Sequence, residues 1–168
     1  MDRKIFWILV SVALIFTSCN REIKQFTGNY SYKLSGEVSL VGEDGEVSYH
    51  LVHKSGQMNI LEDKSQPNRL IITMNEMNGG CYTISATVKG DSIVFLPYEF
   101  STNILISDSP NLFSDDDTPS IVYAIHASGG GQLNDAILMI DEQWVGQQSG
   151  NAAVLLNGPK MKIIAERN

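Results

Sequence analysis

The chain has 168 residues, of which 12 are basic and 19 acidic, so its formal net charge at pH 7 is −7. An acidic chain with scattered basic residues repels phosphate backbones, which excludes nucleic acid as an expected partner. The length suits one domain with a sizeable core. With two cysteines and three histidines, the chain has few residues that could form a disulfide framework or a metal centre.

The N-terminus combines a charged start with an apolar run. Residues 2–4 are Asp, Arg and Lys, and residues 5–16 are apolar except for Ser11. About 12 helical residues would span roughly 18 Å, well short of a hydrocarbon core of about 30 Å. The run is therefore interpreted as the apolar part of a secretion signal and not as a membrane span.

Phe16-Thr17-Ser18-Cys19 ends this run and resembles the lipobox of a bacterial lipoprotein signal. In that family a peptidase cuts before the cysteine, whose thiol carries a diacylglycerol. The resemblance implies a signal peptide at 1–18, lipid attachment at Cys19 and a short tether at 19–25. It also implies a protein anchored to the outer membrane by lipid, and the lack of an acidic run after Cys19 favours the periplasmic side. A general secretion signal with a chance cysteine is the alternative.

Apolar and polar residues alternate with a period of two from Phe26 onward, which predicts half-buried strands. The first strand reaches Leu40 and must bend, with Gly36 as its natural corner. Tight-turn composition at 89–92 predicts a hairpin, and Gly129–Gly131 suggest a flexible hairpin or a bulge. The further strands are expected at Val47–His53, Met58–Ile60, Leu70–Met74, Tyr82–Val88, Ile93–Phe100, Asn103–Ile106, Ile121–Ala127, Leu133–Trp144 and Met161–Arg167.

No amphipathic helical stripe follows the signal. Successive strands without long crossovers favour an all-β, antiparallel up-and-down meander over residues 26–168. Closure into a barrel of about eight to ten strands would remove the exposed sheet edges.

Gly28-Asn29-Tyr30 in the first strand and Ala165-Glu166-Arg167 in the last carry a family resemblance. Lipocalins and their calycin relatives open the first strand with Gly-x-Trp and pack a basic residue of the last strand over that Trp. With Tyr30 at the Trp position, the chain resembles the lipocalin-like (calycin-like) lipoproteins of Bacteroidales. The resemblance implies a calycin-like barrel, with Tyr30 buried and Arg167 close to its ring.

A ligand site is predicted from residues that share apolar strand faces. Tyr49, Leu51 and His53 lie on one face of the second strand, and Tyr82 and Ile84 on the apolar face of another. We expect some of them to line a barrel interior that is open at one end. Apolar walls with a few polar groups suit a fatty or aromatic ligand. Ordinary packing of a filled core is the alternative.

The sequence offers no catalytic, cofactor or metal motif. His50 and His53 point to opposite faces of a strand, as do the adjacent Asp141 and Glu142. The acidic cluster at 115–117 matches no calcium loop, and Cys81 lies on a polar face. The protein is therefore expected not to be an enzyme. The main alternative to ligand binding is a filled barrel that binds an envelope protein. A second alternative is an enzyme using a cavity carboxylate and a histidine.

Overall fold

Period-two alternation gives a sheet in which every second side chain points inward. The computed structural model describes residues 22–41, 45–77, 80–105, 120–148, 154–155 and 160–168. The predicted anchor at Cys19, the start of the tether and the acidic cluster at 115–117 lie outside these residues. The strands are β1 (Gly28–Val41), β2 (Val47–Glu62), β3 (Arg69–Glu76), β4 (Cys81–Lys89), β5 (Ser92–Phe95), β6 (Tyr98–Leu105), β7 (Ser120–Asn134), β8 (Ile137–Gln148), β9 (Val154–Leu155) and β10 (Lys160–Arg167).

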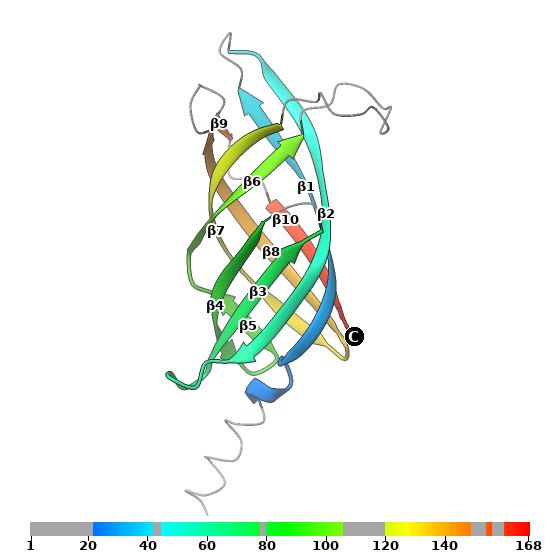
Figure 1. Ribbon diagram of the computed structural model, residues 1–168, viewed down its shortest axis with the longest axis vertical. Coiled ribbons are helices and arrows are strands. Elements are labelled where there is room, and N and C mark those ends of the chain that lie inside the picture. Colours follow the sequence, from blue (N-terminus) through cyan, green and yellow to red (C-terminus); the bar gives the residue numbers. More distant parts are fainter. Residues whose placement is uncertain (1–21, 42–44, 78–79, 106–119, 149–153, 156–159) are drawn as a thin grey trace, which may run out of the picture.

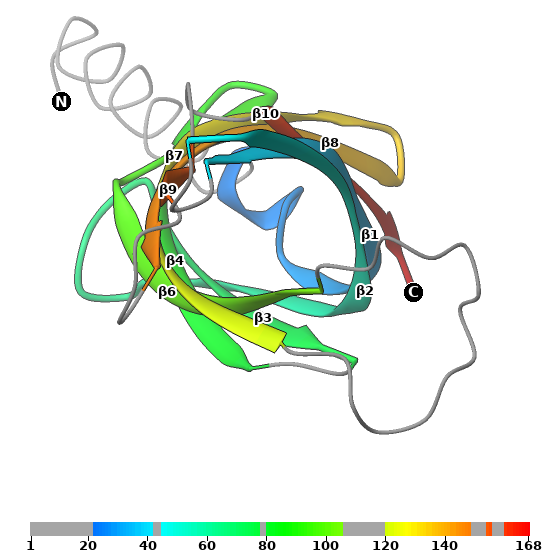
Figure 2. The same ribbon diagram turned by 90° about the horizontal axis from the view of Figure 1, so that it is seen from above.

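The sheet is antiparallel and closes on itself, because β10 pairs with both β8 and β1. β5 and β6 both pair with β7 at different heights, so together they occupy one position in the wall. β9 is a two-residue bridge between β8 and β1. The described residues therefore form a closed barrel with eight wall positions, which Figure 2 shows end-on. The predicted all-β barrel is confirmed.

Several strand boundaries differ from the prediction. β2 is one uninterrupted strand, because Lys54-Ser55-Gly56 continues its ladder with β1 where a break was expected. Leu96-Pro97 divides the predicted strand at 93–100, and residues 103–105 continue β6 instead of standing alone. A missed turn at Asp135-Ala136, with Asp135 at φ 54°, separates β7 from β8.

The glycines at 129–131 lie within β7 and pair residue for residue with β8, so they form neither the predicted hairpin nor a bulge against β8. They pair with β8 on one side, and Gly130 and Gly131 also pair with β5 on the other. A Cβ atom added at Gly129 would lie 2.2 Å from the carbonyl oxygen of Asp141. Glycine is required here because the backbones approach too closely for a side chain.

The lower end of the barrel carries the first described residues and the C-terminus (Figure 1). A helical turn at residues 22–24 precedes β1, and Phe26 is fully buried beneath the strands. Above it, apolar side chains from every wall position fill the interior. The fully buried ones include Met58, Ile60, Leu70, Ile72, Met74, Ile84, Ile93, Leu138, Ile140 and Ile163.

Tyr30 and Arg167 join the first and last strands, as the resemblance implied. They are register partners, and Tyr30 is fully buried. The Arg167 guanidinium carbon lies 5.2 Å from the ring centroid of Tyr30, and its Nη2 donates a 2.6 Å hydrogen bond to the Tyr30 hydroxyl. The Tyr30 hydroxyl donates to the Phe26 carbonyl oxygen at 2.9 Å. This cluster holds the base of the barrel together.

β3 and β4 end lower in the wall than β2 and β6 do (Figure 1). β3 pairs with β2 only from Gly56 to Glu62, so the upper part of β2 extends beyond it. β4 pairs with β5 only from Ala86 to Lys89, and no ladder joins the described parts of β4 and β6. Side chains at this level therefore have to close the wall that the backbone leaves unpaired.

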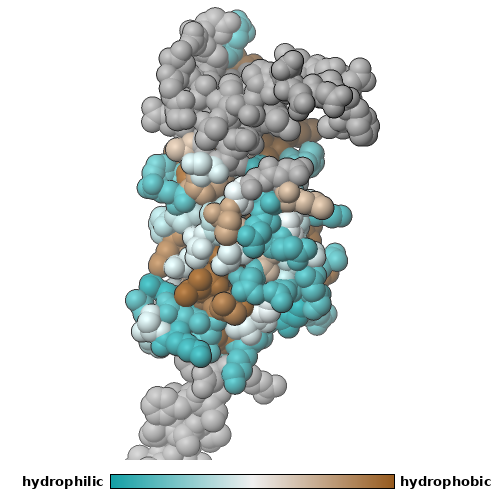
Figure 3. Space-filling model, in the orientation of Figure 1, coloured by the Kyte–Doolittle hydropathy of each residue, from teal (hydrophilic) through white to brown (hydrophobic). Residues whose placement is uncertain are grey.

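The outer surface mixes polar and apolar side chains over the face seen in Figure 3. No helix in the described part of the chain is long and apolar enough to cross a membrane.

Candidate functional site

The inner face of β8 carries one acidic residue in an apolar series. Ile140, Glu142 and Trp144 alternate inward and are all 2% exposed or less. The other buried side chains of the described residues belong to the hydrophobic core, and Glu142 is the one charged side chain buried among them. Its neighbour Asp141 is exposed, so the predicted placement of this acidic pair on opposite faces is confirmed.

Both carboxyl oxygens of Glu142 accept hydrogen bonds. The Tyr98 hydroxyl donates to Oε1 at 2.7 Å, and Trp144 Nε1 donates to Oε2 at 3.0 Å. The register places Tyr98 and Trp144 on either side of Ala127 of β7. The small side chain of Ala127 leaves room for its two large neighbours to reach the carboxyl group.

Glu142 has no positive partner in the part of the chain that the structure describes. Its neighbours across the sheet are Gly129 on β7 and Met161 on β10. No described lysine, arginine or histidine forms an ion pair with it. Burial raises the pKa of Glu142, although the hydrogen bonds from Trp144 and Tyr98 oppose the rise. A buried carboxyl group without a counter-ion is costly in an unliganded core, and such groups are concentrated at functional sites.

The two rings that bond to this carboxyl group, Tyr98 and Trp144, belong to a set of four packed aromatic rings from three strands. Tyr82 of β4 stacks on Phe100 of β6 with 4.6 Å between ring centroids, and Phe100 stacks on Tyr98 at 5.6 Å. The rings of Phe100 and Trp144 meet edge to face at 5.3 Å. We call Tyr82, Tyr98, Phe100 and Trp144 the aromatic wall. It spans the region where β4 and β6 have no backbone ladder.

The hydroxyl of Tyr32 faces the same interior. It is buried and has no hydrogen-bond partner among the described residues. Burial is the main cause that raises its pKa, followed by the charges of Glu76 and Glu142. Gly56 gives the ring its space, because an added Cβ would lie 2.9 Å from it. Buried hydroxyl groups are normally paired, so this one marks a position for a missing partner.

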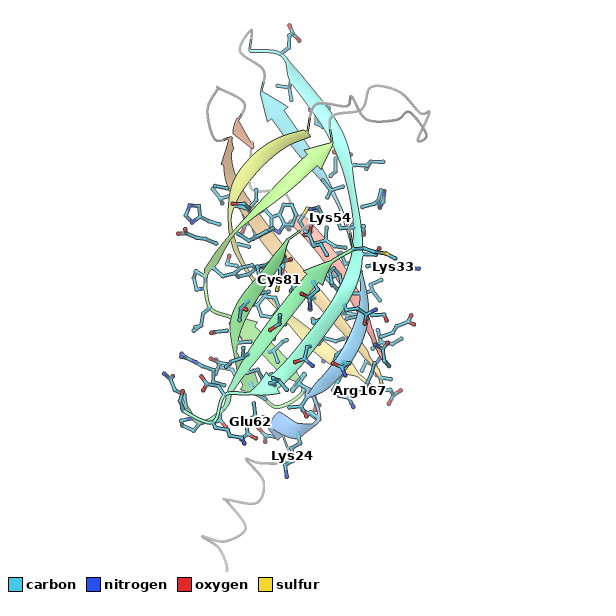
Figure 4. The ribbon with its side chains drawn as sticks, viewed as in Figure 1. Lys24, Lys33, Lys54, Glu62, Cys81 and Arg167 are labelled. Carbon is cyan, nitrogen blue, oxygen red and sulfur yellow. The ribbon has the colours of Figure 1, made fainter. Side chains whose placement is uncertain are left out.

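Lys54 and Glu76 form an ion pair above Tyr32. Lys54 Nζ lies 2.7 Å from Glu76 Oε2, and the two side chains are 15% and 7% exposed. Lys54 and Cys81 lie at the middle level of the barrel, whereas Lys24, Glu62 and Arg167 lie at the lower end (Figure 4). Tyr82 is also only partly buried. Lys54 and Tyr82 therefore keep part of their surface in contact with solvent at the level where β3 and β4 end.

Replacing Glu142 with glutamine should make folding stability less dependent on pH. Because the pKa of Glu142 is raised above its ordinary value of 4.5, the folded protein keeps this proton over a range in which the unfolded chain releases it. The wild type therefore loses stability as the pH rises above 4.5 and through the raised pKa, and the variant lacks this loss.

Urea unfolding of both proteins from about pH 4 to about pH 8 measures this effect, and the stability advantage of Glu142→Gln should grow with pH. Glu166→Gln on the exposed side of β10 is the control. An advantage that does not change with pH would show that Glu142 does not titrate with a raised pKa.

Tyr49, Leu51 and His53 lie on the outer face of β2, so the prediction that they line the interior is wrong. Tyr49 and Leu51 are 68% and 69% exposed, and His53 is exposed as well. Leu51 pairs with the exposed Glu37. The inner face of β2 instead carries Val52 and Met58, with Lys54, Gly56 and Ile60 in the same series. In one continuous strand Leu51 and Met58 are an odd number of residues apart, so they cannot share a face.

Tyr82 and Ile84 face the interior as predicted. Ile84 is 1% exposed, and Tyr82 packs against the core as part of the aromatic wall. Their proposed role as ligand contacts stays a prediction.

The remaining candidate residues do not converge. Cys81 is a free, exposed cysteine, and His126 is exposed beside Glu99 at 3.1 Å. The side chain of His50 lies outside the described residues. Within those residues, no group of three His, Cys, Asp or Glu side chains could hold a metal ion.

Sequence reasoning missed the centre of this site. Glu142 was considered only as half of an acidic pair. The available signal was an acidic residue at an inward position of a strand, between Ile140 and Trp144. Tyr98 could not be linked to Glu142, because the hydrogen bond joins residues 44 positions apart.

No protein-family model matches the sequence, and no curated protein matches it. Among solved structures, the chain is similar to EF1p2_mFAP2b bound to DFHBI, with 13% identity over 89% of this chain and 99% of that chain, at a TM-score of 0.49. It is also similar to a redesigned β-barrel, b11L5F_LGL, with 14% identity over 88% and 96% of the two chains, at a TM-score of 0.42. At these values neither likeness bears on the function.

Proposed function

We propose that this protein binds a small, largely apolar or amphipathic molecule inside the barrel, at the level of Glu142. The observation that carries this proposal is the buried hydroxyl of Tyr32, which has no hydrogen-bond partner among the described residues. A ligand with a polar group would supply that partner, since a buried hydroxyl left unpaired costs about 1–3 kcal/mol.

The composition of the site supports this proposal. Small-molecule sites combine apolar walls with a few polar groups that orient the ligand. The aromatic wall provides the apolar surface, and the Glu142 carboxyl and Tyr32 hydroxyl provide the polar groups. Below this level the interior is filled by apolar side chains. The Glu142 carboxyl and the Tyr32 hydroxyl therefore mark how deep a ligand could reach.

We also propose that a lipid on Cys19 anchors the protein to the outer membrane, with the barrel in the periplasm. The lipobox resemblance of residues 16–19 carries this part. The helical turn at residues 22–24 lies at the lower end of the barrel (Figure 1). An anchor a few residues before it would hold that end toward the membrane and leave the upper end facing away.

Trp144 gives a direct test of ligand binding. Trp7 and Trp144 are the two tryptophans, so the full chain with Trp7→Phe reports on the site alone. The neutral naphthalene dye prodan should bind saturably, gain emission and quench Trp144. Tyr49→Ser on the outer face is the control and should leave the titration unchanged. Absence of saturable binding, or binding without Trp144 quenching, would overturn a ligand site inside the barrel.

A second candidate function, the docking of an envelope protein, is favoured by the outer face of β2. Val47, Tyr49 and Leu51 are apolar there and 43%, 68% and 69% exposed. Exposed apolar side chains that lie together in this way are typical of a surface that binds a protein partner. This function becomes the better explanation if prodan does not bind.

A further inference from the structure

We propose that the natural ligand is an organic cation, an ammonium group on an apolar or aromatic body, and that Glu142 pairs with its charge. This inference rests on the proposed ligand site and names the chemical class that the site selects.

The carboxyl group of Glu142 has acceptor capacity left. An ionised carboxylate offers about four acceptor positions. Tyr98 and Trp144 each use one, on different oxygens. The two donors also fix the orientation of the carboxyl group. A ligand ammonium could occupy the remaining positions and supply the charge that no described residue provides.

The other charged groups of the interior leave Glu142 uncompensated. Lys54 faces inward at this level but is paired with Glu76 at 2.7 Å. The pKa values of Tyr82 and Tyr98 are raised mainly by burial and next by the negative charge of Glu142. Their hydroxyl groups therefore lie within the field of this carboxyl. A ligand carboxylate, such as that of a fatty acid, would meet like charge here and find no described cation free to pair with it.

The aromatic wall adds to the preference for a cation. Ring faces carry negative partial charge and attract a cation within about 6 Å of the ring centroid. Trp144 bonds to the carboxyl group, and Phe100 and Tyr82 pack in series from its ring. The Tyr32 hydroxyl oxygen can accept an ammonium N–H, which would satisfy its unpaired state. The chain charge of −7 also draws cations toward the protein.

Displacement of prodan by three matched compounds tests this inference. The compounds are 4-phenylbutylamine, 4-phenylbutanol and 4-phenylbutyrate, which share one body and differ in charge at neutral pH. We expect the amine to displace the dye at a concentration about ten-fold lower than the alcohol, a difference of about 1.4 kcal/mol. The acid should be the weakest. Equal displacement by amine and alcohol would overturn the inference and leave the ligand site standing.

Glu142→Gln identifies the group responsible for the preference. The glutamine keeps the side-chain shape, and its amide can still bond to Tyr98 and Trp144. The amine should lose its advantage in this variant, while the alcohol displaces prodan as before. Glu99→Gln, on the exposed face of β6, is the matched control and should keep the advantage. Persistence of the advantage in Glu142→Gln would overturn the role of Glu142. If the variant does not fold, the wild-type ranking of the three compounds still decides. Failure of prodan itself to bind would overturn both proposals.

Discussion

Cys19→Ser should abolish fatty-acid labelling of this protein and release it from the membrane fraction. The thiol of Cys19 is the proposed lipid attachment point. Two or more acyl chains give stable attachment, whereas loss of all of them leaves none. Metabolic labelling with an alkyne fatty acid, followed by fractionation of the cells, measures both effects.

The control for this experiment is the second cysteine of the chain. Cys81 is exposed and free, so a non-specific thiol reaction would label it as readily. Cys81→Ser should keep the label and stay with the membranes. Unlabelled wild-type protein, or label that follows Cys81, would refute the lipoprotein assignment without affecting the barrel.

Tyr30→Ala should destabilise the barrel by about 3–5 kcal/mol, the usual cost of removing a large buried aromatic side chain. Tyr30 is fully buried and links β1 to Phe26 below it and to Arg167 of β10. The substitution therefore removes the packing of the buried ring and also the contacts that join β1 to β10 where the sheet closes. Tyr30→Phe keeps the ring and should cost only about 0.5–1.5 kcal/mol.

Urea unfolding of the variants measures these values, with Tyr49→Ala as the matched control. Tyr49 is also a strand tyrosine but is 68% exposed, so its removal should change stability by at most about 0.5 kcal/mol. Similar losses for Tyr30→Ala and Tyr49→Ala would contradict the burial assigned here to the base of the barrel.

Local sequence signals predicted the strands and several of their details. Alternation placed Leu34, Ile72 and Ile84 inward, and the hairpin between β4 and β5 follows from its turn residues, with Gly90 at φ 58°. The Tyr30 and Arg167 pair came from a family resemblance and is present. These features depend on near neighbours in the chain or on a short motif.

The face of β2 and the site around Glu142 depended on the tertiary structure. In the sequence, the apolar residues Tyr49 and Leu51 resemble a core face. Because β2 continues without a break to the buried Met58, an odd number of residues from Leu51, both of them point outward. Glu142 of β8 meets Tyr98 of β6 because β7 lies between them and sets both registers. Periodicity tells which residues share a face, but only the pairing of whole strands and the closure of the sheet decide which face points inward.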